Sequence, residues 1–180
     1  MKTVSRTIVL AGIKHSGKST LGRLLAQRCG AEFYDIDDVL AAEHGQSVRE
    51  LFRAVGQEKF RELEAQTVRK TAEIKGGKVI SLGGGAVTNT FITEDIWQEL
   101  GVKVMIDVSD EVAEKRVFAN GVPAYLEKYA DPRAALKEIN AVRRQEMIKK
   151  CDVVYNADAS FSAEEQAERF YTFLEQKDIL

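Results

Sequence analysis

Eight residues near the start of the chain have the types and spacing of a phosphate-binding loop. The segment Gly12–Ser19 reads GIKHSGKS and fits the pattern G-x-x-x-x-G-K-[ST] at every fixed position. Glycines let successive backbone N–H groups turn inward on phosphate oxygens, and a following helix adds its dipole. In this chemistry Lys18 reaches the β- and γ-phosphates, and the Ser19 hydroxyl is a ligand of Mg²⁺. The predicted nucleotide site comprises Gly12, Ser16, Gly17, Lys18, Ser19 and Thr20.

Two aspartates follow the next predicted strand, residues 32–35. Residues two apart in an extended chain point to the same side, so Asp35 and Asp37 are expected to share one cleft. A hydroxyl that accepts a phosphoryl group needs a carboxylate to take its proton, and Mg²⁺ prefers hard oxygen ligands. The pair can divide these two tasks. The alternative is that one of the three aspartates only caps a helix starting near Val39, and this is the favoured explanation for Asp38.

Three successive glycines follow the predicted strand over residues 78–82. The run Gly83–Gly85 has no side chains, so its backbone donors could approach a small substrate or the γ-phosphate closely. The alternative is a plain strand-to-helix turn, which needs only one or two glycines. For Arg61 and Arg143 the sequence leaves open an ordinary solvated role on a helix surface.

Apolar runs and amphipathic segments alternate along the chain. Strands are predicted at residues 7–11, 32–35, 78–82, 102–108 and 152–155, and the main helices at 20–28, 39–44, 48–54, 57–75, 90–100, 110–116, 132–150 and 163–176. This alternation predicts an α/β fold with a parallel sheet covered on both faces, whose ligands bind at the carboxyl ends of the strands. The phosphate loop, the aspartates and the glycine run all follow strand ends, so we expect them to face one cleft.

Composition narrows the class of protein. The length of 180 residues predicts a single domain, 1–180, and 26 basic against 28 acidic residues argue against nucleic-acid binding through bulk charge. No apolar stretch has the length of a membrane span, and the polar residues 1–6 do not resemble a signal peptide. Cys29 and Cys151 lack metal-ligand spacing, which favours a reducing cytoplasmic location.

Taken together, these segments resemble the shikimate kinase family, within the nucleoside-monophosphate-kinase-like P-loop folds, over nearly the whole chain. The resemblance is carried by the loop with Thr20–Ala26, and by Phe33–Asp37, Phe60–Glu64 and Ile80–Val87. It implies a three-layer P-loop kinase fold with a five-stranded parallel sheet and a mobile lid. It also implies ATP- and Mg²⁺-dependent phosphorylation of the 3-hydroxyl of shikimate, in aromatic amino-acid biosynthesis, by a cytoplasmic enzyme that is expected to be a monomer.

The resemblance also implies roles for individual residues on the acceptor side. Asp37 binds substrate hydroxyls near the transferred proton and, with Lys18, is a catalytic residue. Arg61 and Arg143 share the carboxylate of the substrate, where bidentate charged hydrogen bonds fix its orientation. The backbone of Gly83, Gly84 and Gly85 lines the substrate.

On the nucleotide side, the resemblance implies that Asp35 supports Mg²⁺ together with Ser19. Arg116 matches the arginine that lies against adenine. The predicted partners are therefore small molecules, a nucleotide and a shikimate-like carboxylate, with no nucleic acid and no membrane.

The lid, predicted over residues 117–131, departs from the family pattern. The family carries Arg-Pro-Leu-Leu there, whose arginine reaches the phosphates, whereas this chain reads Val-Pro-Ala-Tyr over residues 122–125. A cation that stabilises the transferring phosphoryl group is worth several powers of ten in rate. We therefore hypothesise that Lys14, Lys128 or Arg133 replaces the missing arginine.

Two other functions remain open from the sequence. A kinase for another small hydroxy acid, such as gluconate, would keep the phosphate loop and change the arginines that hold the substrate. A catalytically weak nucleotide-binding relative would explain the missing lid arginine. The presence of Asp37 and Arg61 argues against it, because a protein that only binds nucleotide needs no acceptor site.

Overall fold

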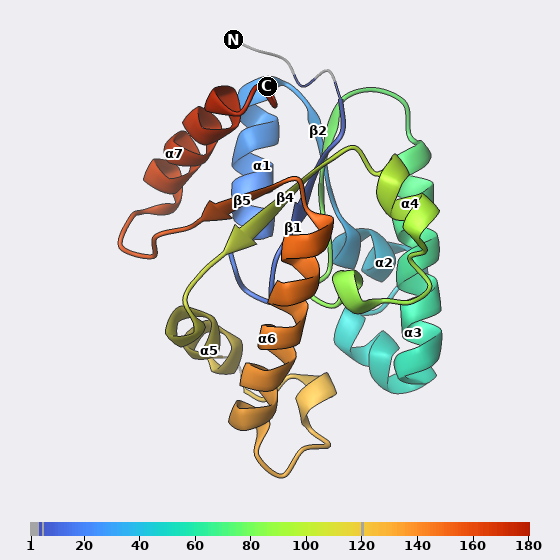
Figure 1. The fold of residues 1–180 in the computed structure, drawn as a ribbon. Helices are drawn as coiled ribbons and strands as arrows, with labels where there is room; N and C mark the ends of the chain where they lie inside the picture. The colour runs from blue at the N-terminus through green and yellow to red at the C-terminus, as the bar shows by residue number, and fades with distance from the viewer. Residues whose placement is uncertain (1–3, 5, 120) are drawn as a thin grey trace.

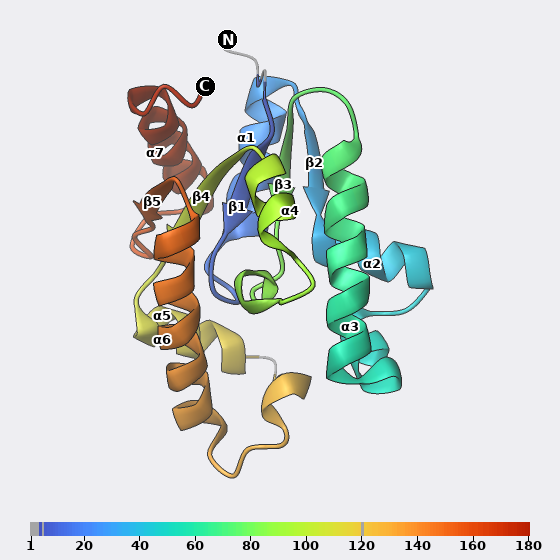
Figure 2. The same ribbon diagram turned by 45° about the vertical axis from the view of Figure 1, so that its right-hand side comes forward.

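Five parallel strands form one sheet in the order β2-β3-β1-β4-β5, with helices on both faces (Figures 1 and 2). The structure is a computed structural model and describes residues 4, 6–119 and 121–180. The strands are β1 (Ile8–Ala11), β2 (Glu32–Asp35), β3 (Lys78–Ser81), β4 (Val102–Asp107) and β5 (Val153–Asn156). The predicted α/β class, three layers and five-stranded parallel sheet are confirmed.

The helices follow the strands as predicted, with two additional short turns. They are α1 (Lys18–Cys29), α2 (Ile36–His44), α3 (Val48–Glu73), α4 (Glu94–Glu99), α5 (Asp110–Phe118), α6 (Pro132–Lys150) and α7 (Ala163–Gln176), with single 3₁₀ turns η1 (Ala86–Thr88) and η2 (Ala124–Leu126). Side-chain caps set several of the starts, since Ser109 caps α5 and Asp131 caps α6 ahead of Pro132. Residues 1–3 and 5, in the segment judged unlike a signal peptide, lie outside the described residues.

Two predicted helix boundaries, near residues 56 and 90, differ in how well they match the structure. The expected break between two helices near residue 56 is confirmed, because Gly56 interrupts α3 with φ 79° and ψ 171°. The predicted helix over residues 90–100 is wrong in its first half. There the side chain of Asn89 accepts a hydrogen bond from the N–H of Phe91 at 3.0 Å, which holds a turn, and α4 begins only at Glu94.

Alternating side chains of the central strands pack into two separate apolar layers. In β1, Ile8 and Leu10 pack in the cluster that includes residues of α1 and α7. Val9 and Ala11 pack in the opposite cluster, which includes residues of α3, α4 and α6. Both faces of the sheet are therefore buried, and the carboxyl edge of β1, β2 and β3 is where polar residues gather.

The predicted lid packs against the body of the protein at two places. Val117 still belongs to α5, and Leu126 of η2 joins it in a small apolar cluster with residues of α6. Glu127 pairs with Arg49 at 2.7 Å and with Arg53 at 2.5 Å, both from the first part of α3. Asn120, inside the predicted lid, lies outside the described residues.

Candidate functional site

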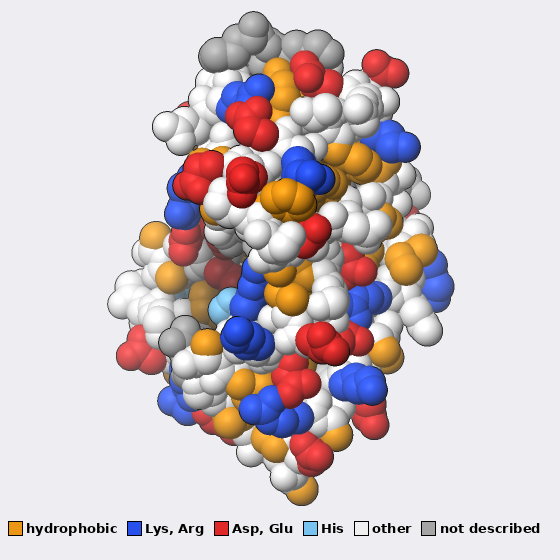
Figure 3. Space-filling view, turned by 90° about the vertical axis from the view of Figure 1, so that its left-hand side faces the viewer, with side chains coloured by type: hydrophobic (Ala, Val, Ile, Leu, Met, Phe, Trp, Pro, Cys, Tyr) orange, Lys and Arg blue, Asp and Glu red, His pale blue; other side chains and the backbone are white. Residues whose placement is uncertain are grey.

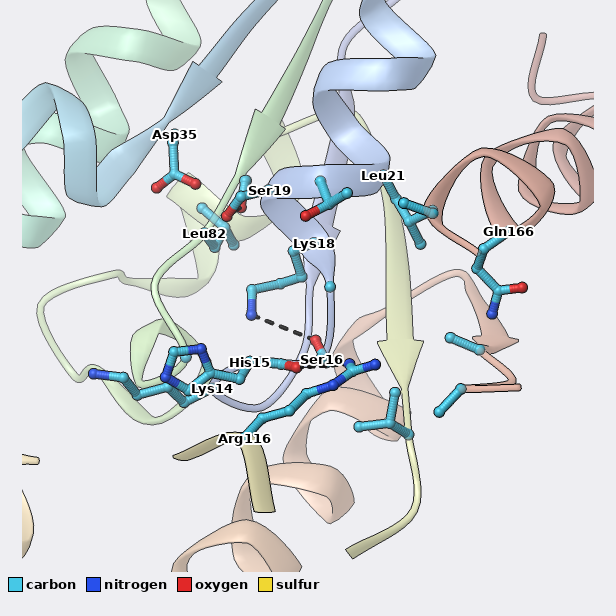
Figure 4. Close-up of a pocket in the computed structure, with 18 of the residues that line it drawn as sticks. Lys14, His15, Ser16, Lys18, Ser19, Leu21, Asp35, Leu82, Arg116 and Gln166 are labelled. Atoms are coloured by element: carbon cyan, nitrogen blue, oxygen red, sulfur yellow. Dashed lines mark hydrogen bonds between the residues drawn. The ribbon is translucent and has the colours of Figure 1, made fainter. Parts of the chain in front are cut away.

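The phosphate loop joins β1 to α1 and is shaped by its glycines. Gly17 has a left-handed φ of 101°, which side chains disfavour, and a Cβ on Gly12 would lie 2.5 Å from the backbone oxygen of Ile106. The ammonium of Lys18 donates to the backbone oxygen of Ile13 at 2.9 Å and lies 3.5 Å from the hydroxyl of Ser16 (Figure 4). The loop thus positions the ammonium of Lys18 where it can bind an anion.

Lys18 is almost fully buried, with 6% of its surface exposed. Burial lowers the pKa of Lys18 to about 8, although Asp37 and Asp35 oppose this shift. A buried cation without a paired carboxylate attracts a phosphate strongly, because much of its hydration has already been lost.

A cleft of about 700 Å³ opens over this loop at the carboxyl edge of the sheet. The surface is visibly hollowed on the side shown in Figure 3, and Lys, Arg and His side chains stand at the edge of the hollow. The predicted residues that line the cleft are Ser16, Gly17, Lys18, Ser19, Thr20, Asp35, Asp37, Gly84 and Arg116. The guanidinium of Arg116 also donates to the backbone oxygen of His15 at 3.1 Å, so it braces the loop.

Asp35 and Asp37 share the cleft, but for a different reason from the one predicted. The chain is not extended here, because α2 begins at Ile36 directly after β2. The side chain of Asp35 caps this helix by accepting from the N–H of Asp37 at 3.0 Å, while Asp38 instead pairs with Arg23 at the surface. The prediction that Asp38 is the capping residue is therefore wrong.

The glycine run lies at the centre of the predicted acceptor side. A Cβ on Gly83 would lie 2.4 Å from a carboxylate oxygen of Glu64, and one on Gly84 would lie 2.9 Å from the backbone nitrogen of Lys14. A Cβ on Gly85 would lie 3.2 Å from the guanidinium of Arg143. Every position of the run is thus in close contact with a different part of the site, which favours the functional interpretation over a plain turn.

Arg61 and Arg143 come from different helices, and both act electrostatically on the buried carboxylate of Glu64. Arg61, on α3, is half-buried and donates to the backbone oxygen of Thr88 at 3.3 Å. Arg143, on α6, is half-buried beside the lid residue Tyr125, whose ring centre is 5.4 Å from the guanidinium carbon. Neither arginine is among the residues that line the cleft.

The neighbouring arginine has a structural role. Arg144 donates to the carboxylate of Asp107 at 2.8 Å and to the backbone oxygen of Val108 at 2.7 Å. These bonds tie α6 to the end of β4. They help explain how Arg143 is held in place on the same turn of α6.

Three residues of this site were missed by the sequence interpretation: Glu64, Asn89 and Tyr125. The amide of Asn89 donates to the carboxylate of Glu64 at 2.8 Å and to the backbone oxygen of Arg61 at 2.8 Å, so it connects these two residues of α3. Glu64 lies one helical turn after Arg61, a spacing that could have revealed it. Nothing in the local sequence distinguishes Asn89 or Tyr125.

Glu64 gives the site a testable pH dependence of stability. Only 4% of its surface is exposed, and burial raises the pKa of Glu64 to about 7, against the bond from Asn89. Between its ordinary pKa and this raised value, the folded protein keeps a proton that the unfolded chain loses, so stability falls as the pH rises through that interval. This fall amounts to at most about 3 kcal/mol in the free energy of unfolding, and we expect Glu64→Gln to abolish it.

Urea unfolding at about pH 5 and about pH 8 measures this difference. The exposed Glu58→Gln on the same helix is the matched control and should unfold with the wild-type pH dependence. An identical pH dependence in Glu64→Gln and wild type would show that Glu64 is not the group responsible.

The three cations proposed to replace a lid arginine lie in different environments. Lys128 donates to the side chain of Gln57 at 3.3 Å, and Arg133 pairs with Glu114. Neither of them lines the cleft, whereas Lys14 does. Of the three, Lys14 is therefore the one that lines the cleft.

The oxygen donors near Lys18 suit a magnesium ion that is also bound by phosphates. The Ser19 hydroxyl lies 3.5 Å from that of Ser81, and Asp35 stands next to it in Figure 4 with one carboxylate oxygen not used in its helix cap. Hard oxygen donors are what Mg²⁺ prefers, and substrate phosphates usually complete its shell. In the described ranges no group of three His, Cys, Asp or Glu residues could hold a metal, and no helix is long and apolar enough to cross a membrane.

Comparison with known proteins agrees with this geometry. A family model described as shikimate kinase matches residues 14–175. The shikimate kinase of Symbiobacterium thermophilum is 37% identical over 76% of this chain and 78% of the relative, and that of Neisseria meningitidis serogroup C is 32% identical over 91% and 90%.

Solved structures agree as well. The Acinetobacter baumannii shikimate kinase in complex with shikimate has a TM-score of 0.84 at 21% identity, covering 96% of this chain and 94% of that one. The Aquifex aeolicus shikimate kinase has a TM-score of 0.77 at 29% identity, covering 96% and 98%. The protein belongs to the shikimate kinase family.

Proposed function

We propose that this protein transfers the γ-phosphoryl group of ATP to the 3-hydroxyl of shikimate. The observation that carries the proposal is the meeting of two sites at one sheet edge. Lys18 and its loop form an anion site, and Asp37 and Gly84 line the same cleft. Gly83 lies against Asp37 and Glu64, and Arg61 and Arg143 both act on the carboxylate of Glu64. A cation-lined nucleotide site beside a carboxylate and two arginines suits a hydroxylated carboxylic acid as acceptor. Membership of the shikimate kinase family supports shikimate as that acid.

The proposed roles follow from charge and position. Arg61 and Arg143 bind the substrate carboxylate and orient the ring, so that its hydroxyl meets the γ-phosphorus in line. Asp37 accepts the hydroxyl proton as the new P–O bond forms, while the bond from the γ-phosphorus to ADP breaks and leaves its electrons on ADP. Lys18 stabilises the negative charge on the phosphate oxygens during transfer.

The remaining predicted groups belong to the nucleotide. Ser19 and Asp35 would hold Mg²⁺, which neutralises phosphate charge when bound. Arg116 stands at the cleft on α5, where we propose that it lies against adenine. Closure of the lid excludes water from the transferring group. The proposal includes a cytoplasmic monomer, since both substrates are small metabolites that need no partner chain.

The test is ADP release from ATP and Mg²⁺ with shikimate, quinate, gluconate or buffer alone. Turnover that depends on shikimate is the expected result. Turnover that depends on gluconate or quinate instead would assign a different acid. Nucleotide binding without turnover on any acid would identify a nucleotide-binding relative, and either result would overturn the proposal.

A further inference from the structure

Cations around the transferring phosphoryl group accelerate its transfer, and the lid supplies none to this cleft. Over residues 117–131 the only lysine or arginine is Lys128. Its ammonium is bonded to Gln57 of α3, away from the lining of the cleft. The adjacent Glu127 forms ion pairs with Arg49 and Arg53, so this part of the lid is bound to α3. The second cation must come from another element.

Lys14 is placed to supply that charge. Its backbone lies against Gly84, where even a Cβ would come within 2.9 Å of the Lys14 nitrogen, so its position in the loop is fixed by the glycine run. Its side chain reaches solvent inside the cleft, and Figure 4 shows it extending away from Lys18, on the side opposite Gln166. Lys14 and Lys18 therefore leave the loop toward different sides.

The Lys14 ammonium is surrounded by residues to which the proposed function gives a role in phosphoryl transfer. Asp37, Arg143 and Arg49 are the charged groups that act on it most strongly, and its ammonium lies 5.9 Å from the ring centre of Tyr125. The cleft walls remove part of its hydration, which lowers the pKa of Lys14 against the opposing influence of Asp37. The ring of Tyr125 thus lies near both cations, because the guanidinium carbon of Arg143 is 5.4 Å from the same ring centre.

We propose that Lys14 is a catalytic residue that contacts the transferring phosphoryl group from the acceptor side, opposite Lys18, in the place that a lid cation would otherwise take. The inference rests on the proposed phosphotransfer function and adds to it a second catalytic lysine within the phosphate loop. A charge placed where negative charge develops stabilises the transition state more than the bound substrates.

Removing this charge should therefore lower kcat and leave binding intact. We expect Lys14→Met and Lys14→Gln to lower kcat by about 100- to 1000-fold, with KM for ATP and shikimate within about threefold of wild type. Lys14→Arg, which keeps a cation, should retain at least about a tenth of kcat. Lys128→Met is the matched control, because it removes the only lid cation, and it should keep the wild-type kcat.

A second readout separates catalysis from a structural role. Binding of Mg²⁺, ADP and aluminium fluoride, which mimics the transferring group, should weaken about as much as kcat in Lys14→Met, while ADP alone binds as in wild type. Unchanged kcat and unchanged analogue binding in Lys14→Met and Lys14→Gln would overturn the inference. So would a raised KM for shikimate at normal kcat, which would make Lys14 an acceptor-binding group.

The outcomes also separate this inference from the proposed function. A wild-type protein without shikimate-dependent turnover contradicts the proposed function. The role of Lys14 is then decided by analogue binding alone, where a loss in Lys14→Met supports it and wild-type affinity overturns it.

Discussion

Replacing Lys18 with methionine is expected to lower kcat by about 1000-fold or more while raising the stability of the ligand-free protein. The loss of activity follows because the ammonium is the loop's cation for the β- and γ-phosphates. The gain in stability follows because a buried ammonium, 6% exposed and bonded to the Ile13 carbonyl, is costly to keep without an anion. Methionine fills similar space without charge, and we expect about 1–2 kcal/mol of additional stability.

The two effects are measured separately, by coupled ADP release and by urea unfolding without nucleotide. Lys137→Met, an exposed lysine on α6, is the control and should change neither quantity. Wild-type turnover in Lys18→Met would remove the basis for a phosphate site in this loop. A loss of stability together with the loss of activity would mean that the lysine mainly holds the loop folded.

Replacing Asp37 with asparagine is expected to lower kcat by about 100- to 10,000-fold, which is the range for losing a positioned general base. Asp37 lines the cleft in the first turn of α2, and one of its carboxylate oxygens would lie 3.2 Å from a Cβ on Gly83. Asparagine keeps the shape and loses the ability to take a proton. Because Asp37 acts on the hydroxyl, the affinity for ATP should stay within about threefold of wild type.

The adjacent Asp38→Asn is the matched control for this substitution. Asp38 is exposed and pairs with Arg23 at 3.6 Å, so its loss should leave kcat within about twofold of wild type. Single-turnover measurement of ADP formation isolates the chemical step from product release. Equal rates for wild type and Asp37→Asn in that measurement would exclude Asp37 as the base.

The nucleotide half of the site was predictable because its chemistry depends on local backbone. The pattern of Gly12–Ser19 predicts a glycine loop between an apolar strand and a helix, and the structure confirms that order and places Lys18 in the cleft. The carboxyl-edge rule for parallel sheets also predicted that Asp35, Asp37 and the glycine run share one cleft, and Asp35, Asp37 and Gly84 do line it. This prediction needed only the order of strands and helices, and small errors in their ends did not affect it.

The acceptor half depends on contacts between residues far apart in sequence. Glu64 and Asn89 are 25 residues apart in the sequence and are joined by a buried hydrogen bond, and no local sequence pattern indicates such a pair. Tyr125 lies near Arg143 of α6 and Lys14 of the phosphate loop, two residues on other elements. The helix cap was assigned to Asp38 instead of Asp35, because the sequence did not show that α2 begins directly at the end of β2.

Phosphorus NMR of the protein with ATP, Mg²⁺ and shikimate tests the central claim most directly. The claim is that the loop holds the triphosphate while Asp37 and the two arginines present an acceptor hydroxyl to it. The wild-type protein should convert the γ-phosphate signal into one phosphomonoester on shikimate for each ADP formed. Formation of inorganic phosphate at the same rate with and without shikimate, or ATP that stays intact, would contradict the claim.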